Sequence, residues 1–92
     1  MIASFNCKDT QALFNGKRVP RFANLAAVAM RKFQQINAAT ALEFLRIPPG
    51  NRLEQLPGNR SGQHSIRIND QWRLCFRFAG GNVFEVEIVD YH

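Results

Sequence analysis

The spacing of the apolar residues changes near the middle of the chain, and this change constrains the fold more than any other feature. Between residues 25 and 36 apolar residues recur at intervals typical of one helix face. They are Leu25, Val28, Ala29, Phe33 and Ile36. After Pro48-Pro49-Gly50 apolar and polar residues alternate, as in strands with one buried face. The alternating apolar residues are Ile66, Ile68, Trp72, Leu74, Phe76, Phe78, Phe84, Val86 and Ile88. Helices followed by a meander of strands predict an α+β fold, with the helices packed on one face of the sheet.

Local sequence signals place the boundaries of these elements. Gly16 is suited to end a first helix, and Asn24 and Thr40 to cap the starts of the next two. The last of these helices must end before Pro48, because proline disfavours a helical residue in front of it. The predicted elements are a strand at 2–5, helices at 8–15, 25–37 and 41–46, and four strands marked by Leu53 and Leu56, by Ile66 and Ile68, by 72–78 and by 84–88.

The composition is that of one small domain spanning residues 1–92. Of these residues 46% are hydrophobic and eight are Phe. A core can therefore form without disulfide bonds, although we expect modest stability at this length. Cys7 and Cys75 have no metal-ligand spacing, and we expect buried free thiols. No apolar run reaches membrane-spanning length and no signal-peptide pattern is present, so we expect an intracellular protein, most simply a cytoplasmic one.

The net charge of +5 is distributed unevenly. Residues 1–46 hold seven basic side chains and two acidic ones, whereas residues 47–92 hold five arginines and five carboxylates. A basic surface favours an anionic partner, although a charge of this size also serves solubility. Every basic residue after Arg46 is an arginine, and arginine is suited to forked contacts with phosphate and to stacking on bases.

Two arginines are predicted to oppose each other across the first hairpin of the sheet. A three-residue connection, 69–71, sets Ile68 opposite Trp72 and therefore Arg67 opposite Arg73. A two-residue loop would instead set an apolar residue opposite an arginine. Because like charges directly opposed are unfavourable, we expect an anionic group near this pair, either a carboxylate of the protein or a phosphate of a ligand.

The next hairpin, around "AGGNV", brings carboxylates to the same face in either of two registers. The two alternatives are Phe78 opposite Phe84 with Arg77 facing Glu85, and Phe76 opposite Phe84 with Arg73 facing Glu87. Both alternatives carry Tyr91 toward Arg73. We therefore expect the residues after the last strand to lie against the arginine-bearing face.

The polar residues exclude several classes of catalyst. No serine lies in a nucleophile elbow, no glycine loop is arranged to cradle a nucleotide, and the cysteines and histidines follow no zinc spacing. Arginines together with Tyr91 and His92 can cleave RNA without a metal. Such cleavage needs a base for the ribose 2′-hydroxyl, an acid for the leaving 5′-oxygen and fixed positive charge. Trp72 and His64 share the apolar phase of their strands, so we interpret both first as core residues.

Several segments resemble the HigB-type toxins of bacterial toxin–antitoxin systems, within the RelE superfamily of ribosome-dependent mRNA endonucleases. The segments are "MIASF", "PPGNRLEQL" at 48–56, "GNRSGQHSIRINDQWRLCFRF" at 58–78 and "EVEIVDYH" at 85–92. The resemblance implies helices on one side of a curved, mainly antiparallel sheet and an RNA site on the other. It implies cleavage of mRNA in the ribosomal A site without a cofactor. It also implies a helix-turn-helix antitoxin of the HigA type, whose complex with the toxin binds operator DNA, and no membrane partner.

The resemblance also implies site residues. The residues matched to the catalytic set are Arg73, Asp90, Tyr91 and His92, and the predicted RNA contacts are Arg67, Asn69, Gln71, His64, Glu54 and Arg60. Some relatives carry a histidine and a lysine where this chain has "LEQLPG", with Glu54 and Pro57. If that histidine moves a proton, then Glu54, His64 or His92 must do so here. The alternative function is an RNA- or ribosome-binding module that blocks translation without cleaving.

Overall fold

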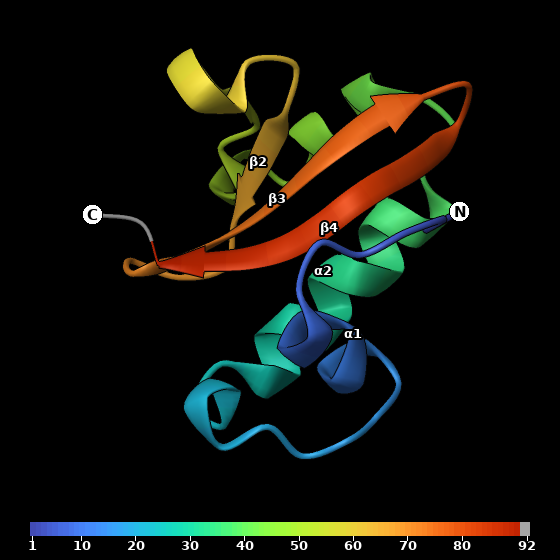
Figure 1. The fold of residues 1–92 in the computed structure, drawn as a ribbon. Coiled ribbons are helices and arrows are strands. Elements are labelled where there is room, and N and C mark those ends of the chain that lie inside the picture. The colour runs from blue at the N-terminus through green and yellow to red at the C-terminus, as the bar shows by residue number, and fades with distance from the viewer. Residues whose placement is uncertain (91–92) are drawn as a thin grey trace.

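The computed structural model describes residues 1–90, which form a helical layer packed on one side of a twisted sheet (Figure 1). The sheet is antiparallel, with strand order β1-β2-β3-β4. Its elements are α1 (Lys8–Phe14), α2 (Ala26–Ala38), β1 (Glu54–Gln55), β2 (His64–Arg67), β3 (Trp72–Ala79) and β4 (Asn82–Asp90). The predicted α+β fold is confirmed. None of the helices in this part of the chain is long and apolar enough to cross a membrane.

Short 3-10 helices connect these elements, and two predicted caps are wrong. The 3-10 helices are η1 (Pro20–Phe22), η2 (Leu42–Arg46), η3 (Pro49–Asn51) and η4 (Gly58–Arg60). Leu25, not Asn24, occupies the N-cap position of α2. Its N–H donates to the Phe22 carbonyl, 3.1 Å away, so the chain enters α2 directly from the turn of η1. Likewise, the N-cap position of η2 is occupied by Ala41, in an extended conformation, and not by Thr40. The helix η2 ends ahead of Pro48 as predicted.

The core lies between the helical layer and the sheet. Its fully buried large side chains include Phe22, Phe33, Ile36, Leu45, Ile66, Leu74, Phe76, Val83, Val86 and Ile88. Thr10 of α1 accepts a hydrogen bond from the Ile88 N–H, 3.0 Å away, and so ties α1 to β4. Both cysteines are free. Cys75 is buried as expected, and burial raises the pKa of its thiol, whereas Cys7 is only half-buried.

The N-terminal segment lies beside β4, although it forms no continuous strand. Two isolated parallel bridges, Ile2 with Val83 and Phe5 with Val86, replace the predicted strand at 2–5. The Ala3 N–H donates to the Val83 carbonyl at 2.7 Å, and the Val86 N–H donates to the Ser4 carbonyl at 3.1 Å. The segment therefore covers the outer edge of β4 (Figure 1), which would otherwise expose unpaired backbone groups.

The two hairpins differ in how well their register was predicted. In the first hairpin Ile66 opposes Leu74 and Arg67 opposes Arg73, so that prediction is confirmed. In the second, both predicted registers are wrong, because a bulge shifts the pairing between Cys75 and Arg77, although the expected contact of Arg77 with Glu85 is formed. Glu85 lies within the bulge with φ of +56°. The shift turns Val83 into the core in place of Phe84, which is only partly buried.

Candidate functional site

Arg73 is the most buried charged side chain on the polar face of the sheet, and three residues of the described chain contact it. Its side chain is 8% exposed. Its Nε donates to Ser65 Oγ at 2.9 Å and its Nη2 donates to the Arg52 carbonyl at 2.6 Å. Glu54 Oε1 lies 3.0 Å from the same Nη2. The anionic group expected near Arg73 is therefore a protein carboxylate, from β1 and not from Glu87. These contacts fix the guanidinium in one orientation.

The hairpin turn beside Arg73 is held by its own side chains. Arg67 pairs with Asp70, whose side chain is fully exposed. Asn69 Oδ1 accepts the N–H groups of Gln71 and Trp72, both at 2.9 Å, which stabilises the turn. Gln71 Nε2 in turn donates to Asp90 Oδ2 at 3.1 Å. The end of β4 is thereby joined to the 69–71 turn.

A polar hollow of about 210 Å³ lies at this end of the sheet. Its lining residues are Arg52, Arg67, Asn69, Asp70 and Arg73, and we call it the arginine cavity. Three arginines line a hollow of this size, which suits a phosphate-sized anion because arginine binds phosphate through forked hydrogen bonds. Asp70 contributes a carboxylate to the same wall, and it is paired with Arg67.

Sequence reasoning missed Arg52, which lines this cavity. Arg52 is exposed and follows η3 with a left-handed backbone, φ of +47°. Within residues 1–90 no carboxylate pairs with it. The turn signal Pro48-Pro49-Gly50-Asn51 directly before it was the available clue. Such a turn can aim the next side chain away from the strand that follows.

Asn51 anchors the turn that carries Arg52 to helix α2. It is fully buried, and its Nδ2 donates to Gln35 Oε1 and to the Leu45 carbonyl, both at 3.1 Å. Lys32 Nζ donates to Asn51 Oδ1. Burial lowers the pKa of Lys32, and the nearby charges of Arg31 and Arg67 lower it further. Contacts of Lys32 and Gln35 with Asn51 thus connect α2 to the turn that precedes Arg52, a lining residue of the cavity.

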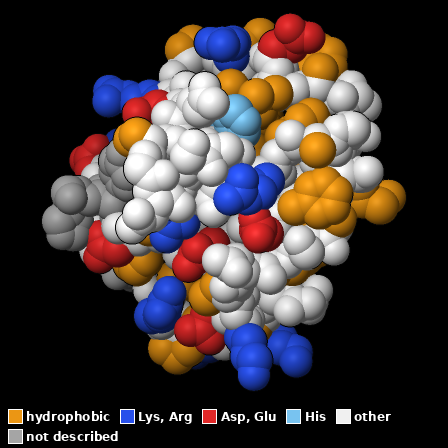
Figure 2. Space-filling model, turned by 45° about the horizontal axis from the view of Figure 1, so that its top comes forward, with side chains coloured by type: hydrophobic (Ala, Val, Ile, Leu, Met, Phe, Trp, Pro, Cys, Tyr) orange, Lys and Arg blue, Asp and Glu red, His pale blue; other side chains and the backbone are white. Residues whose placement is uncertain are grey.

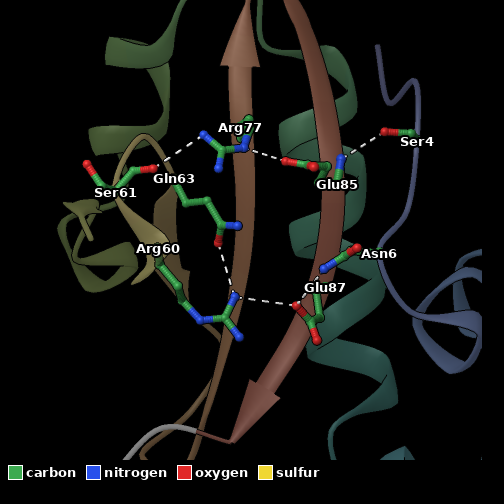
Figure 3. A network of polar contacts seen from close by, with 8 residues as sticks. All are labelled: Ser4, Asn6, Arg60, Ser61, Gln63, Arg77, Glu85 and Glu87. Carbon is green, nitrogen blue, oxygen red and sulfur yellow. Dashed lines mark hydrogen bonds and ion pairs between the residues drawn. The ribbon is translucent and has the colours of Figure 1, made fainter. Parts of the chain in front are cut away.

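The polar face continues away from the cavity as a network of paired charges (Figure 3). Arg60 Nη1 donates to Gln63 Oε1 at 3.1 Å and contacts Glu87 Oε1 at 3.4 Å. Arg77 pairs with Glu85, as one of the predicted registers proposed. Figure 2 shows basic and acidic side chains interleaved on the face that it views. This part of the sheet has little uncompensated charge, and Arg60 does not line the arginine cavity.

His64 and Trp72 occupy the edge of the core. His64 is half-buried, and its ring centroid lies 6.2 Å from that of Phe76. Burial lowers the pKa of its imidazole. The Trp72 ring meets Phe22 edge to face at 5.6 Å. Both positions agree with the core interpretation, and neither residue lines the arginine cavity.

The structure therefore brings together part of the predicted site. Arg67, Asn69 and Arg73 line one cavity, Glu54 contacts Arg73, and Gln71 bonds Asp90. Tyr91 and His92 lie outside the described residues. Within residues 1–90 no three His, Cys, Asp or Glu side chains are grouped to hold a metal ion. The described groups can bind and orient an anion, and Glu54 can also accept a proton.

Comparison with known proteins matches this chain to one described family. Residues 8–92 match the family described as RelE-like toxin of type II toxin-antitoxin system HigB. Toxin HigB-1 from Vibrio cholerae is 53% identical over 51 residues, which are 55% of this chain and 54% of that protein. Endoribonuclease HigB from Proteus vulgaris is 37% identical over 41 residues, 45% of each chain. The matched segments thus span about half the length of these relatives.

Solved structures with the same fold are similar over nearly the whole chain. The YoeB-YefM complex from Staphylococcus aureus contains a chain that superposes with a TM-score of 0.59 and 17% identity, covering 100% of this chain and 95% of that one. YafQ from Escherichia coli superposes with a TM-score of 0.57 and 15% identity, covering 98% and 91%. At these identities the likeness concerns the fold.

Proposed function

The chain belongs to the HigB family of RelE-like toxins of type II toxin–antitoxin systems, and from this premise we propose that it is an endoribonuclease that cleaves mRNA in the ribosomal A site and so inhibits translation. The observation that carries the proposal is the arginine cavity. Three arginines line a hollow at the 69–71 turn, and Gln71 of this turn is hydrogen-bonded to Asp90, the last described residue of β4. Positive charge fixed around a phosphate stabilises the charge that develops during cleavage.

The three arginines are suited to different parts of this task. Arg73 is buried and held by Ser65, Glu54 and the Arg52 carbonyl, so it supplies positive charge in a fixed place. Arg52 is exposed, and within residues 1–90 the carboxylate that pairs with Arg67 is that of the fully exposed Asp70. An ion pair with such an exposed partner is weak, because water and salt screen it. A phosphate can therefore displace Asp70 from Arg67 at small cost.

We assign proton transfer to Glu54 and to the residues that follow Asp90 in the sequence, Tyr91 and His92. The ribose 2′-oxygen forms a bond to its neighbouring phosphorus, and the bond from phosphorus to the 5′-oxygen breaks. The products are a 2′,3′-cyclic phosphate and a free 5′-hydroxyl. The 2′-hydroxyl gives its proton to a base, and the 5′-oxygen takes one from an acid. His92 is suited to the acid role because the ordinary histidine pKa is near neutrality. Tyr91 can stack on a nucleobase or exchange a proton. Glu54, which contacts Arg73, can act as the general base that accepts the proton of the 2′-hydroxyl.

The proposal extends to partners and location. A cytoplasmic toxin of this family would be neutralised by an antitoxin with a helix-turn-helix, of the HigA type, and the complex would bind operator DNA through the antitoxin. The proposed cleavage uses side chains alone and needs no cofactor. The predicted contacts of Arg60 and His64 with RNA remain predictions, since their side chains lie outside the lining of the arginine cavity.

Mapping the 5′ ends of mRNA on purified ribosomes tests the proposed activity. The chain is added to ribosomes programmed with a defined message, and Arg73→Ala is the comparison variant, with its fold checked by a thermal melt. We expect new 5′ ends at one position relative to the A-site codon, and far fewer with Arg73→Ala. Inhibited translation without any new 5′ end would instead support the non-cleaving module.

A further inference from the structure

A second cavity lies in the helical layer, between the end of α1, the loop that follows it and the first half of α2. It has a volume of about 390 Å³. Its apolar lining residues are Leu13, Val19, Ala23, Ala26 and Met30, and Gly16, Lys17 and Arg18 complete its rim. We call it the helical groove. Its size and mostly apolar lining are those of a site that takes apolar side chains from a ligand.

The cations on the rim of the helical groove have no acidic partner in residues 1–90. Lys17 and Arg18 are both exposed, and neither pairs with a carboxylate there. Arg21, only three residues further on, differs. It contacts Asp9 at 3.7 Å, and its guanidinium lies 4.6 Å from the centre of the Phe22 ring. A ligand with acidic groups therefore meets two uncompensated charges beside an apolar surface.

The helical groove and the arginine cavity lie on opposite flanks of α2. Ala26 and Met30 are one turn apart and share the groove side of the helix. Lys32, two residues beyond Met30, is about 200° further around the helix and contacts Asn51, next to Arg52. Figure 1 shows the α1–α2 connection on the far side of the helices from β2. An occupant of the groove therefore need not enter the cavity.

We propose that the helical groove binds an apolar segment of the antitoxin that is flanked by acidic side chains. This inference rests on the proposed function, because it takes the partner of the toxin as the occupant. The phosphates of RNA could pair with the two cations but would not fill the apolar part of the groove. A peptide segment with acidic and apolar side chains can contact both the cations and the apolar lining. Burial of apolar side chains supplies affinity, and the rim charges supply association rate and orientation.

Labelled methionine methyl groups test the location directly. The chain has two methionines. Met30 lines the groove, and Met1 is 70% exposed, with its ammonium group donating to the Gly81 carbonyl at 3.1 Å. Titration with the purified, unlabelled cognate antitoxin should shift the Met30 methyl signal and leave the Met1 signal in place. A parallel titration with ribosomes should leave Met30 unmoved. If the ribosome and not the antitoxin moves Met30, the groove belongs to the ribosome interface and the proposal is overturned.

Charge-reversal variants test the affinity. Lys17→Glu with Arg18→Glu should weaken antitoxin binding, measured by calorimetry, on the order of tenfold or more. The matched control is Lys8→Glu with Arg46→Glu, which makes the same change in net charge at exposed positions outside the groove, and it should keep the affinity within about twofold. Ala26→Leu should fill the groove and weaken binding in a chain whose thermal melt is unchanged. Equal losses of antitoxin affinity in the groove and control variants would mean that only net charge matters. This result would refute the proposal that the groove binds the antitoxin.

A cleavage assay on the same variants separates this inference from the proposed function. The groove variants should cleave ribosome-bound mRNA like the parent chain and resist neutralisation by the antitoxin. If the parent chain cleaves nothing, the proposed function fails whatever the binding result. If the parent chain cleaves, and the antitoxin binds all groove variants at full affinity without moving Met30, the groove inference fails alone.

Discussion

The two halves of the chain differ in how many of their basic side chains contact a carboxylate. In the sheet half, Arg60, Arg67, Arg73 and Arg77 each contact a carboxylate, and Arg52 alone has no acidic partner within residues 1–90. In the helical half, Arg21 is the one basic residue that contacts a carboxylate of the described chain. The net charges differ accordingly, +5 for residues 1–46 and zero for residues 47–92.

This difference indicates that the two halves of the chain have different functions. A guanidinium held by neighbouring carboxylates and carbonyls keeps one position, which suits a reaction that needs charge in a fixed place. An unpaired cation on the surface attracts a charged partner and speeds association, but it holds no fixed geometry. We therefore assign chemistry to the sheet half and partner association to the helical half.

Replacing both Tyr91 and His92 with alanine should have the largest effect on the sheet half. We expect ribosome-dependent cleavage to fall on the order of a thousandfold or more, because the proposed acid, His92, is lost together with Tyr91. The fold should persist, since Val86 and Ile88 still fill the core. Cleavage is measured by 5′-end mapping and folding by a thermal melt. A fully active double variant would remove both residues from the mechanism.

Arg73→Ala should lower cleavage on the order of a hundredfold, because it removes fixed charge from the arginine cavity. It should also lower the free energy of unfolding by about 1–3 kcal/mol, since Glu54 and Ser65 lose a charged partner. Arg73→Lys is the matched control, since it keeps the charge and loses the fork. Unchanged cleavage in a folded Arg73→Ala chain would contradict the assigned role.

Asn51→Ala tests the link between the two halves. The change leaves Lys32 and Gln35 without their shared partner, so unfolding should become easier by about 1–3 kcal/mol. Because Asn51 anchors the turn that positions Arg52, mRNA cleavage should fall as well, by a smaller factor than for Arg73→Ala. Denaturant unfolding and the cleavage assay together check this. A loss of stability with full cleavage would show that the turn does not position Arg52 for the reaction.

The smallest expected effect is a pH dependence of stability from His64. Burial lowers the pKa of its imidazole in the folded state, so the unfolded chain binds the proton more readily. The contribution of neutral His64 is complete above the ordinary histidine pKa of about 6.5. It is lost as the pH falls from there through the folded pKa. His64→Gln should flatten this part of the stability curve measured by denaturant unfolding. An identical slope in the variant would assign the pH dependence to another group.

The sequence was sufficient wherever a regular pattern decided the structure. Alternation of apolar residues placed Arg67 opposite Arg73, because one buried face admits a single register. The bulge at Glu85 broke the same reasoning in the next hairpin, since alternation cannot reveal an extra residue in one strand. The caps at Asn24 and Thr40 failed because tertiary packing set the helix starts. Arg52 was missed because its left-handed turn follows no period.

Cleavage and antitoxin affinity, measured together in two variants, test the division of labour most directly. One variant is Arg73→Ala, and the other is Lys17→Glu with Arg18→Glu. Our account predicts that the first loses mRNA cleavage and keeps its affinity for the antitoxin. It predicts that the second keeps cleavage and loses affinity. If both variants lose both properties while remaining folded, or if their effects are exchanged, the two halves do not divide chemistry from association.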